Sequence, residues 1–236
     1  MARIKKPRSV IDSLIFLKKA IETHTTDSES GVSYLSAGIV EKTQTFTPLL
    51  EQGMGDKARF VSNAQKERKE KNESIDELKT YIRDFWEVAK RRIYRENLPV
   101  ELLAHYQLPK SGNLPYLNSD GQALEMAPLL IKGDADAVGK GYPAMVNPSA
   151  EALQEVLDKA RREAADVSNA DRELDEAQER VSDLMPEAKR LIDRIIAELE
   201  FNLYDKDDSS KRRIMRNYGV KYELAKDEEP DELIDE

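Results

Sequence analysis

The hydrophobic residues between Asn147 and Tyr204 recur in steps of three and four. From Ala164 to Ile195 the steps alternate strictly after one repeated three, and charged residues fill most positions between them. This spacing, about 3.5 residues per repeat, is typical of a coiled-coil seam. The pattern therefore predicts one long helix over about 148–204, with these seam residues: Leu153, Val156, Ala160, Ala164, Val167, Ala170, Leu174, Ala177, Val181, Leu184, Ala188, Leu191, Ile195 and Leu199.

Three prolines and a polar stretch indicate where the long helices could begin, kink or break. Asn147 and Pro148 predict the start of the 148–204 helix, and Pro186 predicts a kink within it. A second helical region is expected over about 31–97, where Thr47-Pro48 has the composition of a helix start and residues 62–74 carry almost no apolar side chain. The pattern leaves open whether 31–97 is one kinked helix or a hairpin.

Shorter elements are expected at both ends of the chain. Apolar residues from Val10 to Ile21 predict an amphipathic helix, followed by a polar loop over 24–31. Near the other end, the turn 205–210 precedes a short basic helix, Lys211–Tyr218, which Gly219 ends. Residues 223–236 are strongly acidic, and we expect them to form a disordered tail.

Residues 98–148, here called the capping segment, contain six of the ten prolines and five of the ten glycines. Two short helices fit its pattern, over 99–106 and about 119–132, and Gly133–Gly141 is expected to be a loop. The segment also carries many large apolar residues, which would be costly to leave in water. We therefore expect it to be ordered and to dock on the long helices.

These elements predict an all-α fold, an antiparallel bundle of long, coiled-coil-like helices with an irregular, proline-rich capping segment. The expected organisation is a single elongated domain over residues 1–222, with long helices over about 31–97 and 148–204 and a cap over 98–147. The acidic tail lies outside this domain.

Composition narrows the possible chemistry. The chain has 236 residues, a net charge of −9, 35% charged residues, two histidines and no cysteine. Without cysteine, disulfides, thiolate metal sites and cysteine nucleophiles are excluded. No apolar run approaches the length of a membrane span, and the N-terminus is a poor secretory signal, so a cytoplasmic location is expected.

Motifs for metal or nucleotide binding are incomplete. A di-iron carboxylate bundle needs Glu-x-x-His, but neither His24 nor His105 follows a glutamate at that spacing. Glu163 and Glu198 lie beside the seam without a partner motif. The stretch from Asp205 lacks the glycine and glutamate of a calcium-binding loop, and Gly133–Gly141 lacks the spacing of a phosphate-binding loop. We therefore predict no catalytic residue, metal site or cofactor.

Two basic clusters and one aromatic stripe are the candidate interaction residues. The first cluster is Lys90-Arg91-Arg92 with Arg95, at a helix end. The second is Lys211-Arg212-Arg213 with Arg216, just before the acidic tail. Either cluster could contact phosphate, although pairing with the tail or with a helix flank fits an acidic protein better, and nucleic acid is not expected as a partner. Tyr81, Phe85 and Trp86 fit a bundle core better than a ligand site. The interaction candidates are Phe85, Trp86, Arg212, Arg213, Arg216 and Tyr218.

Four short signatures occur in order along the chain: Tyr106–Pro109, Gly141–Ala150, Ala170-Asp-Arg and Arg212–Gly219. Together they resemble a group of uncharacterised bacterial proteins of all-helical appearance that share them. The resemblance covers about residues 81–222 and implies a bacterial helical module. It implies no activity, ligand or functional residue.

The expected function is that of a non-enzymatic structural or interaction protein, which presents helical surfaces to further copies of itself or to a protein partner. A narrow bundle of two or three long helices leaves apolar seam surface to be covered, which favours association. The alternative is a bundle that binds a small ligand or a metal between the long helices and segment 98–148.

Overall fold

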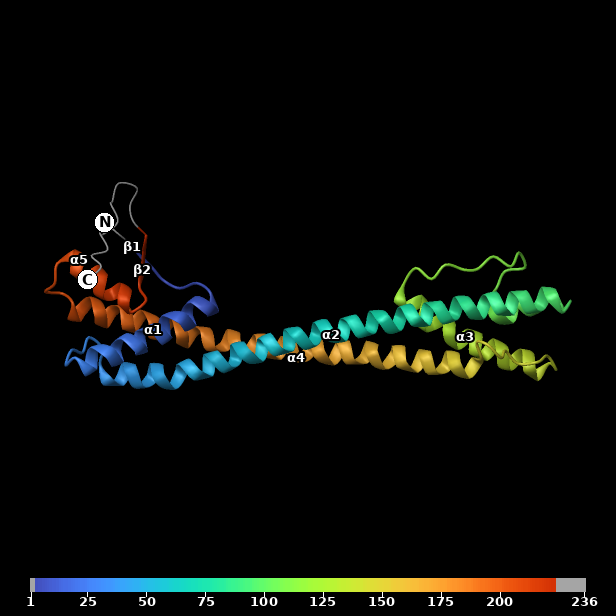
Figure 1. Cartoon of the computed structure of the whole chain (residues 1–236), viewed down its shortest axis with the longest axis horizontal. Coiled ribbons are helices and arrows are strands. Elements are labelled where there is room, and N and C mark those ends of the chain that lie inside the picture. Colours follow the sequence, from blue (N-terminus) through green and yellow to red (C-terminus); the bar gives the residue numbers. More distant parts are fainter. Residues whose placement is uncertain (1–2, 224–236) are drawn as a thin grey trace. The chain divides into compact units, whose positions relative to one another are not determined.

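The computed structural model describes residues 3–223 and is built almost entirely of helices (Figure 1). The predicted all-α fold is confirmed, because the long helices α2 and α4 run antiparallel and pack against each other. In chain order the elements are β1 (Arg3–Lys5), α1 (Val10–Glu29), α2 (Ala37–Arg95), the 3-10 helix η1 (Val100–Tyr106), α3 (Asp120–Gly139), α4 (Ala150–Asn202), α5 (Asp208–Asn217) and β2 (Lys221–Glu223).

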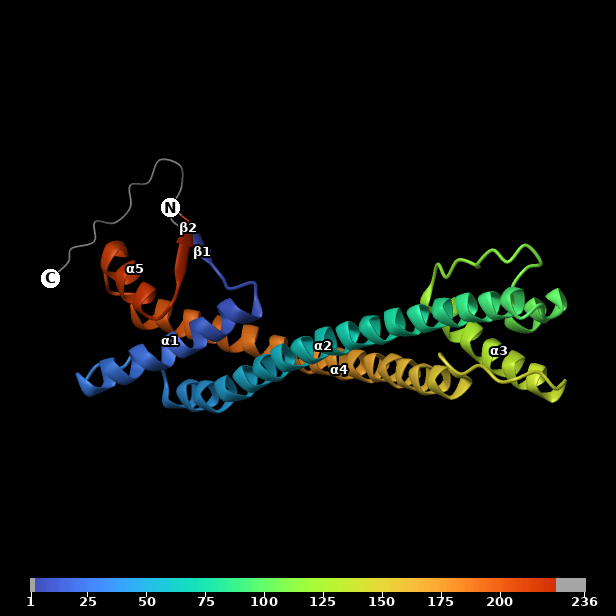
Figure 2. The ribbon, with the colours of Figure 1, turned by 45° about the vertical axis from the view of Figure 1, so that its right-hand side comes forward.

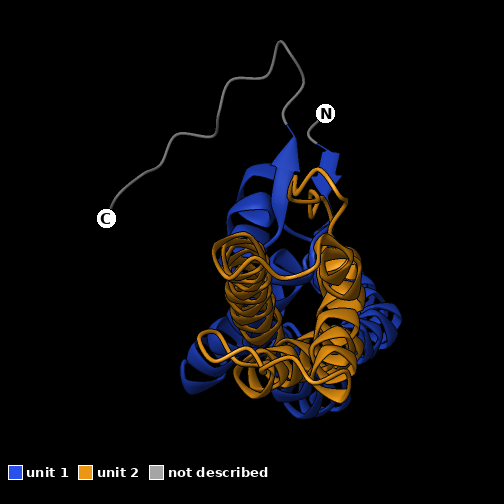
Figure 3. Ribbon diagram, turned by 90° about the vertical axis from the view of Figure 1, so that its right-hand side faces the viewer, with its two compact units in different colours: residues 1–59, 175–236 blue, residues 60–174 orange. Residues whose placement is uncertain are grey.

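The chain divides into two compact units, coloured separately in Figure 3. Unit 1 comprises residues 1–59 and 175–236, and unit 2 comprises residues 60–174. Helices α2 and α4 contribute a segment to each unit, and each unit has its own hydrophobic core. The single elongated domain expected for residues 1–222 stays a prediction.

Helix α2 is continuous from Ala37 to Arg95, so the helix start predicted at Thr47-Pro48 is wrong. Pro48 removes one backbone hydrogen bond, but Phe46 and Leu50 beside it are buried in the core of unit 1. The threonine hydroxyl that precedes Pro48 does not cap a new helix, since it donates to the Thr43 carbonyl at 2.7 Å. Burial of the apolar face thus outweighs the local signal for a break.

The polar stretch 62–74 is helical as well, with ion pairs along its surface. Lys66 pairs with Glu70 at 3.3 Å and Lys69 with Glu73 at 3.7 Å, each four residues apart on the helix. Arg68 reaches α4, where it pairs with Asp171 at 2.7 Å. These contacts explain how a stretch with few apolar side chains remains helical.

Helix α4 follows the predicted seam. Ten of the fourteen seam residues are buried and the other four are half-buried, and Pro186 lies within one uninterrupted helix. The predicted kink at Pro186 stays a prediction. The predicted start is wrong: the helix begins at Ala150, and the hydroxyl of Ser149 accepts a hydrogen bond from the Ala152 N–H. Ser149 therefore takes the capping role expected of Asn147.

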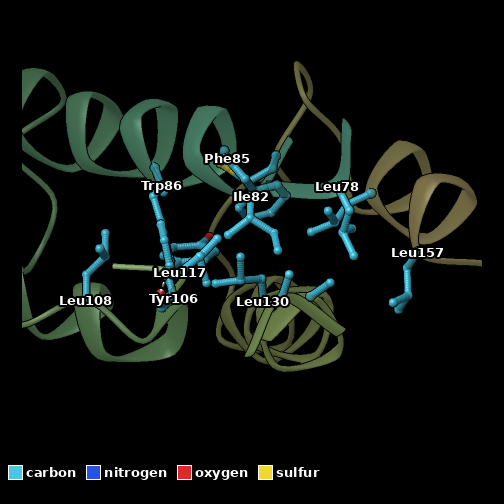
Figure 4. Packing of buried hydrophobic residues seen from close by; sticks show 14 of the residues in the cluster. Leu78, Ile82, Phe85, Trp86, Tyr106, Leu108, Leu117, Leu130 and Leu157 are labelled. Carbon is cyan, nitrogen blue, oxygen red and sulfur yellow. Dashed lines mark hydrogen bonds between the residues drawn. The ribbon is translucent and has the colours of Figure 1, made fainter. Parts of the chain in front are cut away.

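In unit 2 the capping segment is ordered and packs on α2 and α4, as predicted. Figure 4 shows Phe85 and Trp86 of α2 with Tyr106 and Leu130 of the capping segment. The Trp86 indole donates to the Tyr106 carbonyl at 2.9 Å. Large apolar side chains from η1 and α3 therefore close this core instead of facing water.

The loop predicted over Gly133–Gly141 is wrong, because α3 continues to Gly139. Gly133 lies against the backbone of η1, where a Cβ atom would overlap the carbonyl oxygen of His105. The glycine thus permits a close approach of two helices, a packing role that outweighs its low helix propensity.

In unit 1 the first described residues pair with the last. Strands β1 and β2 are antiparallel, with Arg3 opposite Glu223 and Lys5 opposite Lys221 (Figures 1 and 2). The sequence pattern did not predict this small sheet, and Glu223 had been placed in the tail. The remainder of the predicted disordered tail, residues 224–236, lies outside the described residues.

Helix α1 extends to Glu29, so the polar loop predicted from His24 is wrong over residues 24–29. The added turn is held from outside the helix: Asp27 accepts a hydrogen bond from the Tyr218 hydroxyl at 2.6 Å, and Thr23 donates to the Asn217 carbonyl at 2.7 Å. The predicted short basic helix is present as α5, but it begins at Asp208, within the predicted turn, with Asp207 as its N-terminal cap and Gly219 just beyond its end. Among residues 3–223, no helix has the length and apolarity needed to cross a bilayer.

Candidate functional site

Unit 1 contains a cleft of about 340 Å³ between three parts of the chain. The segment before α1 forms one side, one face of α1 forms the base, and the loop between α5 and β2 forms the other side. We call this hollow the basic cleft, and its lining residues are Lys5, Lys6, Pro7, Arg8, Asp12, Ile15, Phe16, Lys19, Arg216, Gly219, Val220 and Lys221.

Two local features build the basic cleft. The pairing of β1 with β2 brings Lys5 and Lys221 to one place, although they are far apart in the sequence. Gly219 turns the chain after α5 with a φ of +92°, and its Cα lies close enough to α1 that an added Cβ would be 3.4 Å from the Phe16 ring. The glycine thus satisfies both the left-handed turn and the close approach to α1.

The charge of the basic cleft is strongly positive. Six cationic side chains line it, against one carboxylate among the described lining residues. Acidic residues neutralise part of this charge: Lys5 pairs with Glu223 at 3.4 Å, and Lys6 pairs with Asp193 at 2.8 Å. Arg8 and Lys19 are exposed and form no ion pair with another residue in the range 3–223. A net positive potential therefore remains at the cleft.

The one carboxylate of the lining is Asp12, in the first turn of α1. A hydrogen bond from the Ser9 hydroxyl, at 2.7 Å, and the ammonium group of Lys221, at 3.4 Å, hold the pKa of Asp12 below its ordinary value. Asp12 is therefore ionised at neutral pH and ties β2 to the start of α1.

The base of the basic cleft is apolar. Phe16 and Val220 are buried in the core of unit 1, whereas Ile15 is 55% exposed. Ile11, one turn earlier on α1, is exposed to a similar extent. A ligand that combines negative charge with an apolar group would therefore match both the rim and the base of this cleft.

The sequence-predicted interaction residues are divided between the two units. Arg216 lines the basic cleft, where its guanidinium lies 5.7 Å from the centre of the Tyr222 ring. Arg212 and Arg213 lie on the same helix, the first half-buried and the second exposed. Phe85 and Trp86 are fully buried in the core of unit 2, the position that the sequence pattern favoured for them.

Tyr218 is also fully buried, and its ring packs edge-on against Tyr34, with centroids 6.4 Å apart. Burial, together with the hydrogen bond to Asp27, raises the pKa of the Tyr218 hydroxyl, which therefore stays protonated. Its contacts hold α5 against α1, and they place the side chain inside unit 1 and not on its surface.

Sequence reasoning missed most of the basic cleft. Arg216 was among the predicted residues, but Lys5, Lys6, Arg8 and Lys19 were not. The basic run at the start of the chain and Lys19 were visible signals. The strand pairing that brings the basic run close to Lys221 was not visible in the sequence, because strands of three residues carry too little periodicity to be recognised.

The other predicted basic cluster lines a hollow of about 450 Å³ in unit 2, between the end of α2 and residues 143–147. Two of its three arginines have partners there. Arg92 donates to the carbonyls of Pro143 and Ala144 and pairs with Glu96, and Arg91 pairs with Glu87. Arg92 therefore fastens the capping segment to α2.

Apart from this hollow, the interior between the long helices and segment 98–148, expected as a ligand site under the alternative function, is filled by side chains. Asp134 is buried there, and its carboxylate accepts hydrogen bonds from the Tyr106 hydroxyl and the Met145 N–H, both at 3.1 Å. Burial, followed by the charge of Asp134, raises the pKa of Tyr106. The buried polar groups thus satisfy one another.

Three carboxylates, of Glu67, Glu163 and Asp166, have oxygen atoms within 4.8 Å of one another in unit 2. Lys66 lies 3.5 Å from Glu67 and supplies a positive charge at the same place. Glu198, the other acid beside the seam, accepts hydrogen bonds from the N–H and hydroxyl of Ser36, both at 2.8 Å. Lys66 therefore offsets part of the negative charge of the three carboxylates, and Glu198 binds the residue that precedes α2.

Comparison of the chain with models of protein families, with curated proteins and with solved structures gives no match.

Proposed function

We propose that this protein is a non-enzymatic interaction protein, and that the basic cleft of unit 1 binds an acidic segment of a partner protein that also carries apolar side chains. The observation that carries the proposal is the concentration of six cationic side chains around an apolar base, in a chain whose net charge is −9. A protein of that charge repels acidic partners in general, and a cationic cleft gives such a partner a place to approach.

Charge complementarity supplies the rate and the specificity of such an encounter. Arg8 and Lys19 project from the cleft without a described ion-pair partner, so their charge is available to a ligand. Their interaction with carboxylates is screened by salt, because both side chains are exposed.

Apolar contact supplies much of the affinity. Ile11 and Ile15 are exposed on the face of α1 at and beside the cleft, and burial of one large apolar side chain contributes about 1.5–3 kcal/mol. An acidic segment without apolar residues would leave these side chains in water. We therefore expect the bound segment to contain both kinds of residue.

The state of unit 2 supports an interaction role over the small-ligand alternative. Its interior is filled, and the polar groups of Asp134 and Tyr106 are used by each other. Unit 1 offers further contact surface in Phe201 and Tyr204, each 81% exposed, and exposed aromatic residues are frequent at protein–protein interfaces.

The test is fluorescence anisotropy of the full chain with a labelled synthetic peptide, in which Leu-Phe is flanked on both sides by a pair of acidic residues. We expect saturable binding at low ionic strength, weakened about tenfold by Lys19→Glu. The matched control is Lys206→Glu, which changes the net charge equally at an exposed site of unit 1 outside the cleft. A peptide with serine in place of Leu-Phe should bind more weakly, because it leaves the apolar base uncovered.

Two results would overturn the proposal. One is an equal loss of affinity in Lys19→Glu and Lys206→Glu, which would indicate general charge attraction and no site. The other is tighter binding of a single-stranded RNA of equal charge than of the peptide, which would make nucleic acid the better ligand.

A further inference from the structure

The acidic end of the chain has the composition that the basic cleft would bind. Residues 224–236 contain seven acidic residues and one lysine. Within them, Leu233 and Ile234 stand between Asp231-Glu232 and Asp235-Glu236. An apolar pair with carboxylates on both sides matches a cleft with an apolar base and a cationic rim.

The connection of this segment to unit 1 brings it within reach. Strand β2 ends at Glu223, and Lys221 in the same strand lines the basic cleft. Leu233 follows Glu223 by ten positions, which can span up to about 33 Å. That length allows the chain to reverse after β2 and return to the cleft, since a reversal needs about four residues.

We propose that residues 231–236 bind in the basic cleft of their own chain. Leu233 and Ile234 cover Ile15 and the exposed edge of the base, and the flanking carboxylates pair with Lys19 and Arg8. The contact is independent of any partner. Its consequence, competition with the acidic segment of a partner protein, rests on the function proposed above.

Residues 231–236 have an advantage over a separate partner because they belong to the same chain as the basic cleft. A short connection within one chain gives an effective concentration in the millimolar range. A segment whose intrinsic Kd is about 0.1 mM would then occupy the cleft in most molecules and weaken a competing partner about tenfold. A partner with a more acidic or more apolar segment would displace it, and a raised salt concentration would release it.

Carbodiimide cross-linking tests the contact directly, because this reagent joins carboxylates to lysines only when they are in contact. Isotope-labelled and unlabelled full chains are mixed at low concentration, and cross-linked peptides are identified by mass spectrometry. We expect Lys19 to be joined to Asp231, Glu232, Asp235 or Glu236 within one chain. Lys206 provides the control, since it is exposed in unit 1 but lies outside the cleft.

Two cross-linking outcomes would contradict the proposal. Products that join labelled to unlabelled chains would show that the segment binds a second copy. Equal reaction of Lys19 and Lys206 would show that it has no preferred site. Replacement of Leu233 and Ile234 by serine should reduce the Lys19 product several-fold while leaving every carboxylate in place, and an unchanged yield would remove the role of the apolar pair.

A second measurement separates this inference from the proposed function. The full chain with Asp231→Asn, Glu232→Gln, Asp235→Asn and Glu236→Gln keeps its length but loses four charges. We expect it to bind the Leu-Phe peptide about tenfold more tightly than the parent chain. Equal binding by both chains would refute occupancy of the cleft and leave the proposed function standing. Binding by neither chain, together with the Lys19 cross-link, would refute the proposed function and leave the intramolecular contact standing.

Discussion

Each unit joins distant parts of the chain through a tyrosine that donates to an aspartate, but in different surroundings. In unit 2, Tyr106 donates to Asp134, which is 3% exposed and also accepts from the Met145 N–H. In unit 1, Tyr218 is buried, but its acceptor, Asp27, is half-buried at the end of α1. The same chemical pair therefore belongs to the core of one unit and to the edge of the other.

The hydrophobic cores of the two units also differ in how completely they are closed from the surface. The core of unit 2 is closed by η1 and α3, and its buried groups contact one another. The core of unit 1 reaches the surface at the basic cleft, where Phe16 lines both the core and the hollow. A closed core serves stability alone, whereas an open one leaves apolar and charged groups available for binding. This contrast makes four predictions, ordered by the expected size of the effect.

The largest effect is expected from Leu191→Asp in unit 1. Leu191 is fully buried in the seam of α4, so the substitution removes apolar contacts and buries a charge. We expect a loss of about 4 kcal/mol or more in the free energy of unfolding. Leu184→Asp should cost about half as much, because Leu184 is half-buried and its new carboxylate can reach water.

Hydrogen exchange followed by mass spectrometry measures this loss separately in each unit. With Leu191→Asp, amides in residues 188–203 should exchange faster, while those in residues 75–93 should change less. Equal acceleration in both ranges would show that the two units unfold together, and the contrast between them would then not extend to their stability.

The next effect is expected from Gly133→Ala in unit 2. An added Cβ would overlap the His105 carbonyl, and backbone on both sides leaves no flexible side chain to move aside. We expect a loss of about 3 kcal/mol, in the range of overpacked cores. Gly139→Ala is the control on the same helix: with open space around it, it should be neutral or stabilise by up to about 1 kcal/mol. Urea unfolding of both variants gives the comparison, and similar midpoints would contradict it.

The two tyrosine–aspartate pairs are compared directly by Tyr106→Phe and Tyr218→Phe. Removal of the Tyr106 hydroxyl leaves a buried carboxylate short of a donor, which costs about 1–3 kcal/mol. Removal of the Tyr218 hydroxyl should cost about 1 kcal/mol or less, because water can reach Asp27. Thermal unfolding at neutral pH compares the stability losses of the two variants. A larger loss of stability for Tyr218→Phe would reverse the assignment of core and edge.

The smallest effect concerns Asp120 at the start of α3. Hydrogen bonds from Lys71 and Lys79, at 2.8 and 3.1 Å, hold the pKa of Asp120 below its ordinary value of 3.8. A lowered pKa contributes stability above the unfolded value, and this is lost as the pH falls through the folded value. Asp120→Asn should therefore lower the Tm by about 2 °C or less at pH 6, since the pair is partly exposed. The difference should shrink as the pH falls below 3.8, and a difference that grows on acidification would have the wrong sign.

The sequence predicted the long helices well because their apolar repeat extends over many turns. It failed where a tertiary contact outweighed the local pattern. Residues 24–29 are polar enough for a loop, but Tyr218 and Asn217 hold them in α1. Gly133 suggests a loop, but its missing side chain allows α3 to pack on η1. Thr47-Pro48 lacks any local sign that buried neighbours would hold the helix together.

The basic cleft could be predicted only in part for a related reason. Charge is visible in a sequence, so Arg216 and its neighbours on α5 were recognised as candidates. The cleft, however, combines residues from the two ends of the described chain, and only the pairing of β1 with β2 brings them together. Trp86 shows the reverse case: it was an interaction candidate because it is aromatic, but the sequence pattern favoured a core position, and it is buried in unit 2.

The pairing of β1 with β2 also bears on the order of events during synthesis. Residues 60–174 are contiguous, so unit 2 can fold while the ribosome is still translating the rest of the chain. Unit 1 cannot, because Arg3 must wait for Glu223 before the strands can pair. Contacts between residues so distant in sequence form slowly, so the pairing of the two strands is a late step. The basic cleft therefore exists only in chains translated through β2.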